Sequence, residues 1–213
     1  MLRNVEERVK VLLAGAEGGH DWWHAHRVRR VALRLAHEEG ADPFVVELAA
    51  LLHDIADPKF HDGDEEAGPR QARHILDDAG VPPEVRDHVL HIIRHISFRG
   101  GHAPVPAYRS PELAVVQDAD RLDALGAIGI ARTFNYGGYR QRPLYDPTIP
   151  PRQYDSAEEY RKSRTPTINH FYEKLLLLKD RMNTTAGKKM AEQRHRFMES
   201  FLEEFFREWK GER

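Results

Sequence analysis

The segment FVVELAALL at 44–52 constrains the fold of this chain more than any other feature, because it is apolar on nearly every side. Asp42 and Pro43 precede it in the order typical of a helix N-cap and a first helical residue. A helix that is apolar all round must be covered by neighbouring elements. The sequence therefore predicts a central buried helix, and this helix ends in two ionisable residues, His53 and Asp54.

The remaining chain also shows helical periodicity. Val28, Val31 and Leu35 recur at the spacing of one helix face, and His24 lies one turn before Val28 on the same face. An all-α fold is expected, with helices over 24–37, 66–79, 81–98 and 112–134 and two more within 166–210. The weakly periodic stretch 135–165 is expected to be a long ordered loop, of the kind that serves as a lid or binding loop.

Composition narrows the class of protein. Hydrophobic residues make up 40% of the chain and charged residues 31%, which is typical of a soluble globular protein. The net charge of -2 gives no general field for a nucleic-acid polymer or a membrane, and neither partner is expected. The first 20 residues fail as a signal peptide and no run is long enough to span a membrane, so a cytoplasmic location is expected.

Four polar side chains are predicted to point into one interior. They are His24, His53, Asp54 and Asp120, the last because Leu113, Val116, Asp120 and Ala127 would share a face of the expected helix 112–134. A single buried histidine is more often a hydrogen-bonded core residue. Together, however, neutral imidazoles and ionised carboxylates are the forms in which a divalent metal is bound. The chain has no cysteine, so nitrogen and oxygen must supply all ligands.

Three short motifs, HAHRV at 24–28, LLHDI at 51–55 and DADRLDALG at 118–126, resemble the H…HD…D signature of the HD-domain metal-dependent phosphohydrolases. Longer segments across nearly the whole chain resemble the YedJ/YpgQ group of that family. The resemblance implies an HD-domain helical bundle with additional C-terminal helices, forming one domain over 1–213. Its metal-binding core would cover about 20–132, and a loop and helical extension would cover about 133–213.

The resemblance carries the ligand roles onto His24, His53, Asp54 and Asp120, with Asp120 preferred over Asp118 because it lies in an A-D-x-L context. It implies one divalent ion, Mn²⁺ or Mg²⁺, with Fe²⁺, Ni²⁺ and Zn²⁺ as alternatives. It also implies that a nucleoside triphosphate is hydrolysed to the monophosphate and pyrophosphate. Alternatives on the same site are a nucleotidase, a cyclic-nucleotide phosphodiesterase, a (p)ppGpp hydrolase, or a non-catalytic nucleotide- or metal-sensing module.

Further residues are candidates, either because they lie close to the proposed ligands in sequence or, for His91 and His95, because they form a stripe with His88 at helical spacing. Asp57 and Glu65 are candidate general bases, and Lys59 is a candidate phosphate ligand. Contacts to the substrate are expected from Arg27, Arg121, Asp123, His91 and His95. The spacing of His88, His91 and His95 would also suit a second metal, although one ion is favoured.

Two features remain. His20, one turn before His24, is expected to start its helix at the rim of the pocket and to assist orientation. The aromatic stripe formed by Phe197, Phe201, Leu202, Phe205 and Trp209 is expected to be core or the interface of a homodimer.

Overall fold

The computed structural model describes residues 1–15, 19–55, 64, 66–96, 108–154, 159 and 163–212. Within these ranges the regular secondary structure is helical and there is no strand. The expectation of an all-α fold is therefore confirmed. The chain divides into two compact units, Met1–Asp120 and Arg121–Arg213. The expectation of a single domain over the whole chain stays a prediction.

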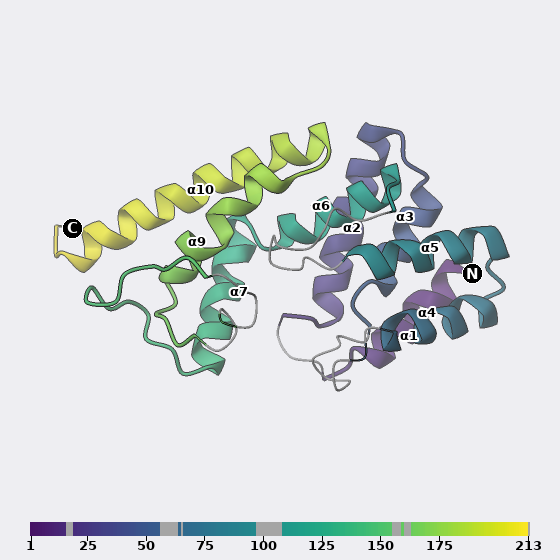
Figure 1. The fold of residues 1–213 in the computed structure, drawn as a ribbon, viewed down its shortest axis with the longest axis horizontal. Coiled ribbons are helices and arrows are strands. Elements are labelled where there is room, and N and C mark those ends of the chain that lie inside the picture. The colour runs from purple at the N-terminus through teal and green to yellow at the C-terminus, as the bar shows by residue number, and fades with distance from the viewer. Residues whose placement is uncertain are drawn as a thin grey trace. The chain divides into compact units, whose positions relative to one another are not determined.

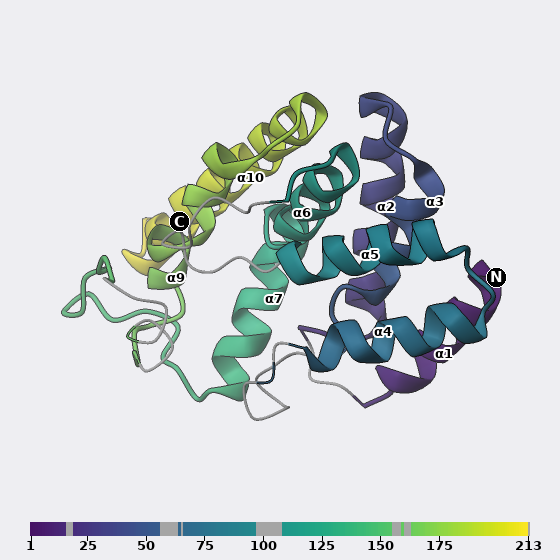
Figure 2. The ribbon, with the colours of Figure 1, turned by 45° about the vertical axis from the view of Figure 1, so that its right-hand side comes forward.

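The first unit is built from six helices of the described chain, the last of which continues into the second unit. They are α1 (Leu2–Leu12), α2 (Trp22–Glu39), α3 (Pro43–Leu52), α4 (Ala67–Asp78), α5 (Pro83–Ile96) and α6 (Pro111–Asp123). Helix α3 packs against α1, α2 and α5 (Figure 1). Helices α4 and α5 lie side by side (Figure 2).

Helix α3 is the buried central helix that the sequence predicts. The Asp42 side chain accepts hydrogen bonds from the backbone N–H groups of Phe44 and Val45, which caps the first turn. Leu48 and Leu52 are fully buried, and the half-buried Glu47 is ion-paired with Arg29 of α2. Helix α3 ends at Leu52, and His53 follows at its C-cap.

Helix α2 presents His24 to the interior, as its periodicity predicts. Asp21 is the N-cap and accepts a hydrogen bond of 2.8 Å from the backbone N–H of His24. The side chain of His24 is 2% exposed, and Val28 and Leu35 on the same stripe are fully buried. The N-cap and the apolar stripe together set the direction in which His24 points.

The expectation of one helix over 112–134 is wrong. Helix α6 ends at Asp123 and a new helix, α7 (Gly126–Tyr139), follows. Leu125 has extended backbone angles and Gly126 has φ 72°, in the left-handed region that favours glycine, so the helix cannot continue. Ala127 consequently lies on α7 and does not share a face with Asp120.

The second unit contains the end of α6, then α7, α9 (Asn169–Glu173), the 3₁₀ helix η2 (Leu175–Arg181) and α10 (Thr185–Trp209). Helix α10 packs on α7 and on η2. The two helices expected within 166–210 are thus a short one, a 3₁₀ segment and one long helix. Residues 135–139 belong to α7, so the expected loop begins later than predicted, and its role as a lid stays a prediction.

The aromatic stripe on α10 is partly core. Leu202 is buried, and the Phe201 ring stacks on Phe171 of α9 with centroids 5.8 Å apart. Phe197 and Trp209 are about half exposed. The alternative of a homodimer interface stays a prediction. Among the described residues, no helix is both long enough and apolar enough to cross a lipid bilayer.

Adjacent glycines on α7 provide a matched test of packing in the second unit. A Cβ added to Gly137 would lie 2.3 Å from Oγ1 of the buried Thr167, whereas one added to Gly138 would meet nothing within 4 Å. We expect Gly137→Ala to lower the free energy of unfolding by about 1–3 kcal/mol through overpacking. Gly138→Ala is expected to raise the free energy of unfolding by up to about 1 kcal/mol, because alanine has a higher helix propensity than glycine. Urea denaturation of both variants measures the difference, and equal shifts would contradict the packing described.

Candidate metal centre

Side chains from separate segments of the first unit converge on one point. Nε2 of His24, from α2, lies 3.2 Å from Nε2 of His53, which follows α3. The carboxylate oxygen Oδ1 of Asp120, on α6, lies 3.5 Å from Nε2 of His24 and 3.9 Å from Nε2 of His53. Oδ2 of Asp54 lies 3.9 Å from Nε2 of His24. The structure therefore brings together the four residues that the sequence predicts as ligands.

The protonation of His53 suits metal binding. Its Nδ1 lies 2.8 Å from the backbone carbonyl oxygen of Ala50. A carbonyl only accepts hydrogen bonds, so Nδ1 carries a proton, and in the neutral ring Nε2 is then the atom with the lone pair that a metal requires. Such a bond to the backbone is the usual way of fixing the ring of a ligating histidine. His53 thus turns its Nε2 toward His24 and Asp120.

The donor set fits a divalent ion. Zinc binds nitrogen and oxygen, and magnesium binds oxygen, at about 2.0–2.2 Å, which places neighbouring ligand atoms about 2.8–3.6 Å apart in octahedral or tetrahedral geometry. The separations of 3.2, 3.5, 3.9 and 3.9 Å found here are close to that range. Two groups of three residues meet the geometric requirement for a metal, namely His24 with His53 and Asp120, and His20 with His24 and Asp54.

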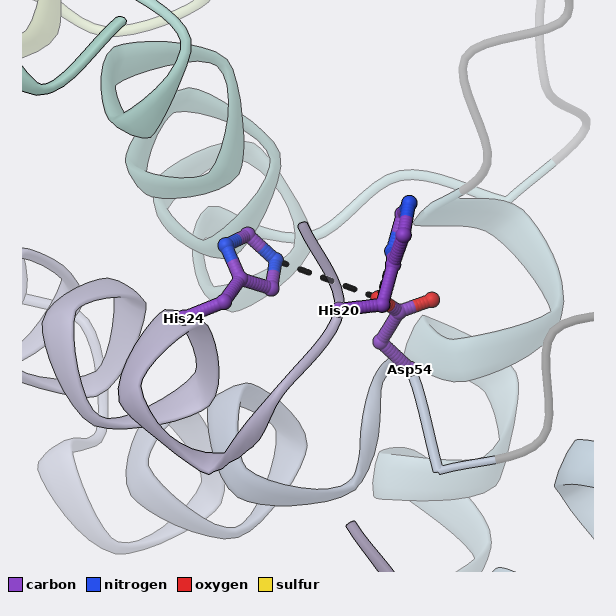
Figure 3. A group of neighbouring side chains, drawn as sticks. All are labelled: His20, His24 and Asp54. Carbon is purple, nitrogen blue, oxygen red and sulfur yellow. Dashed lines mark hydrogen bonds and ion pairs between the residues drawn. The ribbon is translucent and has the colours of Figure 1, made fainter. Parts of the chain in front are cut away.

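His20 contacts the Asp54 carboxylate directly, with Nδ1 against Oδ2, and Figure 3 shows its ring standing beside the carboxylate. Burial raises the pKa of Asp54. The hydrogen bond from His20 and the charges of His53, His20 and His24 outweigh this effect and lower the pKa to about 2. Asp54 is therefore ionised at neutral pH, which is the form that binds a cation.

The two candidate aspartates of α6 have different environments. Asp118 is fully buried, and Asp120 is the one whose carboxylate lies next to His24 and His53. Residues two apart on a helix point in different directions, so only one of them can face α2 and the end of α3. The geometry favours Asp120 as the sequence predicts.

The histidines expected to bind substrate lie on α5, next to Tyr108. The His91 ring stacks on Tyr108 with centroids 5.1 Å apart and an interplanar angle of 22°, and His95 lies 5.5 Å from the same ring. Gln117 donates a 2.9 Å hydrogen bond to the carbonyl of His95. Gln117 is one turn before Asp120 on α6, so this bond fixes the end of α5 one helical turn from a proposed ligand.

The other residues expected at the substrate have different surroundings. Arg27 is half-buried on α2, one turn after His24. Arg121 and Asp123 belong to the second unit, where Nη1 of Arg121 donates a 2.7 Å hydrogen bond to the carbonyl of Arg181. Their proposed contacts with substrate stay predictions. Asp57, Lys59 and Glu65 lie outside the described residues.

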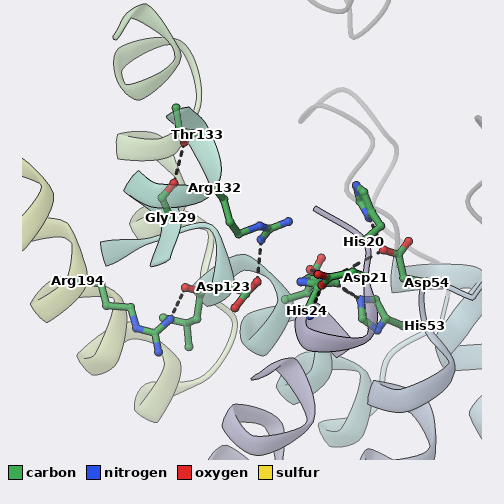
Figure 4. A network of polar contacts seen from close by, with 12 residues as sticks. His20, Asp21, His24, His53, Asp54, Asp123, Gly129, Arg132, Thr133 and Arg194 are labelled. Carbon is green, nitrogen blue, oxygen red and sulfur yellow. Dashed lines mark hydrogen bonds and ion pairs between the residues drawn. The ribbon is translucent and has the colours of Figure 1, made fainter. Parts of the chain in front are cut away.

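Sequence reasoning missed the partner of Asp123. This carboxylate is 3% exposed and accepts a 2.8 Å ion-paired hydrogen bond from Nη1 of Arg132 on α7, seen with other polar contacts in Figure 4. Arg132 follows Asp123 by nine residues, a spacing that one continuous helix would not bring together. The signal was the Leu125-Gly126 step, where the chain turns between α6 and α7.

Two features define the class to which the protein belongs. The described chain is an all-α bundle, and its histidines and aspartates could hold a metal. The chain belongs to the HD domain family, whose model matches residues 22–125. Its fold is that of the HD-superfamily hydrolases. The solved structure of such a hydrolase from Bacillus thuringiensis is 47% identical, with a TM-score of 0.78, over 98% of this chain and 96% of that one.

Two Bacillus subtilis proteins are also similar. YpgQ, an uncharacterized protein, is 38% identical over 203 residues, which cover 95% of this chain and 91% of YpgQ. Its crystal structure in complex with ADP has a TM-score of 0.76, at 32% identity over 98% of this chain and 97% of that one. The symmetrical bis(5'-nucleosyl)-tetraphosphatase is 34% identical over 106 residues, covering 50% of this chain and 48% of that enzyme.

Proposed function

We propose that this protein is a divalent-metal-dependent phosphohydrolase that cleaves a phosphoanhydride bond of a nucleotide. The favoured reaction is hydrolysis of a nucleoside or deoxynucleoside triphosphate to the monophosphate and pyrophosphate. The observation that carries the proposal is the position of His24, whose Nε2 lies 3.2 Å from Nε2 of His53, 3.5 Å from Oδ1 of Asp120 and 3.9 Å from Oδ2 of Asp54. These residues come from distant parts of the sequence, and an N/O donor set of this kind suits Mn²⁺, Mg²⁺, Fe²⁺, Ni²⁺ or Zn²⁺.

The chain's own residues have distinct roles in this proposal. The hydrogen bond from His53 to Ala50 orients one imidazole, and the buried position of His24 fixes the other. A bound ion would supply a water of lowered pKa and neutralise charge on a phosphate oxygen. Asp120 is 35% exposed, and we propose that the substrate approaches from its side.

Substrate contacts are proposed for further residues. His91 and His95 gather around the Tyr108 ring near the end of α5 and are proposed to contact the substrate there. Arg27, Lys59 and Arg121 would contribute positive charge toward a polyphosphate. We assign Asp123 the task of holding Arg132, because its buried carboxylate forms an ion pair with that partly exposed side chain. Asp57 and Glu65 remain the two candidates for the general base.

A nucleotide is favoured as the substrate because of what two relatives bind or act on. YpgQ, which aligns with nearly the whole chain, was crystallised with ADP. The tetraphosphatase is named for a dinucleoside polyphosphate substrate, although it aligns with only half of this chain. Both observations point to a ligand with consecutive phosphates, since ADP and the tetraphosphate share that feature. Nucleotidase, cyclic-nucleotide phosphodiesterase and (p)ppGpp hydrolase activities are the alternatives on the same site.

Product analysis tests the proposed function. The purified protein is incubated with Mn²⁺ or Mg²⁺ together with one candidate substrate at a time. The candidates are nucleoside and deoxynucleoside triphosphates, diphosphates, monophosphates, cyclic nucleotides and (p)ppGpp. We expect equal amounts of monophosphate and pyrophosphate from triphosphates, detected by ion-exchange chromatography and ³¹P NMR. Release of orthophosphate from monophosphates would favour a nucleotidase instead. Tight nucleotide binding without turnover under every metal would reject an enzyme and favour a sensing module.

A further inference from the structure

His20 is the one described side chain outside the predicted ligand set that belongs to a metal-compatible group. It immediately precedes Asp21, the N-cap of α2, and its side chain is 37% exposed. From there its Nδ1 reaches Oδ2 of Asp54, which lies 34 residues further along the chain. The His20 and His24 rings also meet edge to face, with centroids 5.8 Å apart.

Asp54 has the weakest backbone support of the four proposed ligands. His24 and Asp120 project from the helices α2 and α6, and His53 is fixed at the C-cap of α3 by its bond to Ala50. Asp54 follows the end of α3 in a turn. Within the described chain, the hydrogen bond that restrains its carboxylate comes from His20.

The direction of that hydrogen bond is determined by chemistry. An ionised carboxylate only accepts hydrogen bonds, so the proton lies on Nδ1 of His20. With Oδ2 of Asp54 engaged in this way, the rotation of the carboxylate about its last bond is restricted. A partner that orients a ligating group in this manner typically raises metal affinity 10- to 100-fold.

We propose that His20 is a positioning residue, which donates its Nδ1–H to Asp54 and thereby holds that carboxylate for the metal. The inference rests on the proposed function, since it requires that Asp54 binds the ion. It differs from direct ligation of the metal by His20, in which the imidazole itself would be a ligand. The two roles are separable because amide side chains can replace the donor without replacing the ligand.

Three substitutions of His20 form the test. In His20→Asn the amide nitrogen is separated from Cα by the same number of bonds as Nδ1, so the hydrogen bond to Asp54 is retained. In His20→Gln the amide lies one bond further out, near the position of Nε2, and in His20→Leu no donor remains. His37, exposed near the end of the same helix, provides the control variant His37→Leu.

The measurement is the affinity of the metal-free protein for Mn²⁺ by isothermal titration calorimetry, with far-UV circular dichroism as a check on folding. Relative to wild type, His20→Leu is expected to raise the Kd about 10- to 100-fold. His20→Asn should stay within about threefold, His20→Gln should fall between the two, and His37→Leu should match wild type. An unchanged Kd in His20→Leu would overturn the proposal, as would a Kd in His20→Asn as high as that of His20→Leu, which indicates direct ligation.

The variant His24→Ala separates this inference from the proposed function. If wild type binds Mn²⁺, His24→Ala does not, and His20→Leu binds as wild type does, the metal site stands and only the role of His20 is rejected. If wild type itself binds no divalent ion, both the proposed function and the role of His20 are rejected. Loss of affinity in His24→Ala together with rescue in His20→Asn supports both.

Discussion

The His53→Ala variant is expected to lose more than about 100-fold of metal-dependent hydrolysis. His53 is a proposed metal ligand, with Nε2 3.2 Å from Nε2 of His24. Removal of a residue that only orients a ligand typically costs 10- to 100-fold in metal affinity or activity. Removal of a ligand should cost more, because a bound ion would then have one fewer ligand and the phosphate would be less well positioned for the reaction. Initial rates of pyrophosphate release at saturating Mn²⁺ measure the effect.

A buried histidine elsewhere in the chain provides the control for this variant. His195 on α10 is 8% exposed and lies next to Glu199, so His195→Ala removes a side chain of the same size and similar burial from the second unit. We expect His195→Ala to retain activity while its thermal stability falls. Comparable losses of activity in both variants, or wild-type activity in His53→Ala, would contradict the proposed role of His53.

The variant Leu48→Ala should be strongly destabilised. Leu48 is fully buried in α3, which packs against α1, α2 and α5, so truncation leaves a cavity that surrounding helices cannot easily fill. We expect the free energy of unfolding to fall by about 2–5 kcal/mol. Chemical denaturation of the metal-free protein, followed by circular dichroism, measures this change without a contribution from metal binding.

The matched control is Leu12→Ala at the end of α1, where the side chain is 40% exposed. This substitution removes the same atoms, and it should cost less than about 1 kcal/mol. A cost for Leu48→Ala as small as that for Leu12→Ala would mean that α3 is not the buried centre of the first unit.

Local rules predicted the parts of the fold that neighbouring residues determine. Asp42 and Pro43 set the start of α3, and the apolar residues that surround Glu47 on nearly every side of 44–52 required burial, as observed. The inward direction of His24 followed from its spacing to Val28. In each case the deciding interaction lies within one or two helical turns, or depends only on the apolar pattern.

The break between α6 and α7 could not be predicted in this way. Glycines are tolerated within helical patterns, so Gly126 alone does not decide between a helix interior and a turn. The turn is accompanied by distant contacts. Arg194 of α10 donates to the carbonyl of Leu122, and Arg132 of α7 pairs with Asp123. Such contacts depend on how α7 and α10 pack, which no local pattern encodes.

The candidate site likewise has features that the local sequence predicts and features that depend on distant contacts. The order His, His-Asp and Asp along the chain identified the four side chains, because each ends or interrupts an apolar stripe. The choice of Asp120 over Asp118 rested on the helix face expected to hold Asp120 and on the resemblance, and the structure favours Asp120 through its distances to His24 and His53. The direct bond between His20 and Asp54 joins two turns 34 residues apart, so sequence spacing predicted only that His20 lies near the rim.

The most direct test of the metal centre is a crystal structure of the protein grown with Mn²⁺, with anomalous differences recorded at the manganese edge. We predict an anomalous peak within about 2.0–2.3 Å of Nε2 of His24, Nε2 of His53 and one carboxylate oxygen each of Asp54 and Asp120. The absence of a peak between these four side chains at millimolar Mn²⁺, with the residues bonded only to one another, would contradict the account.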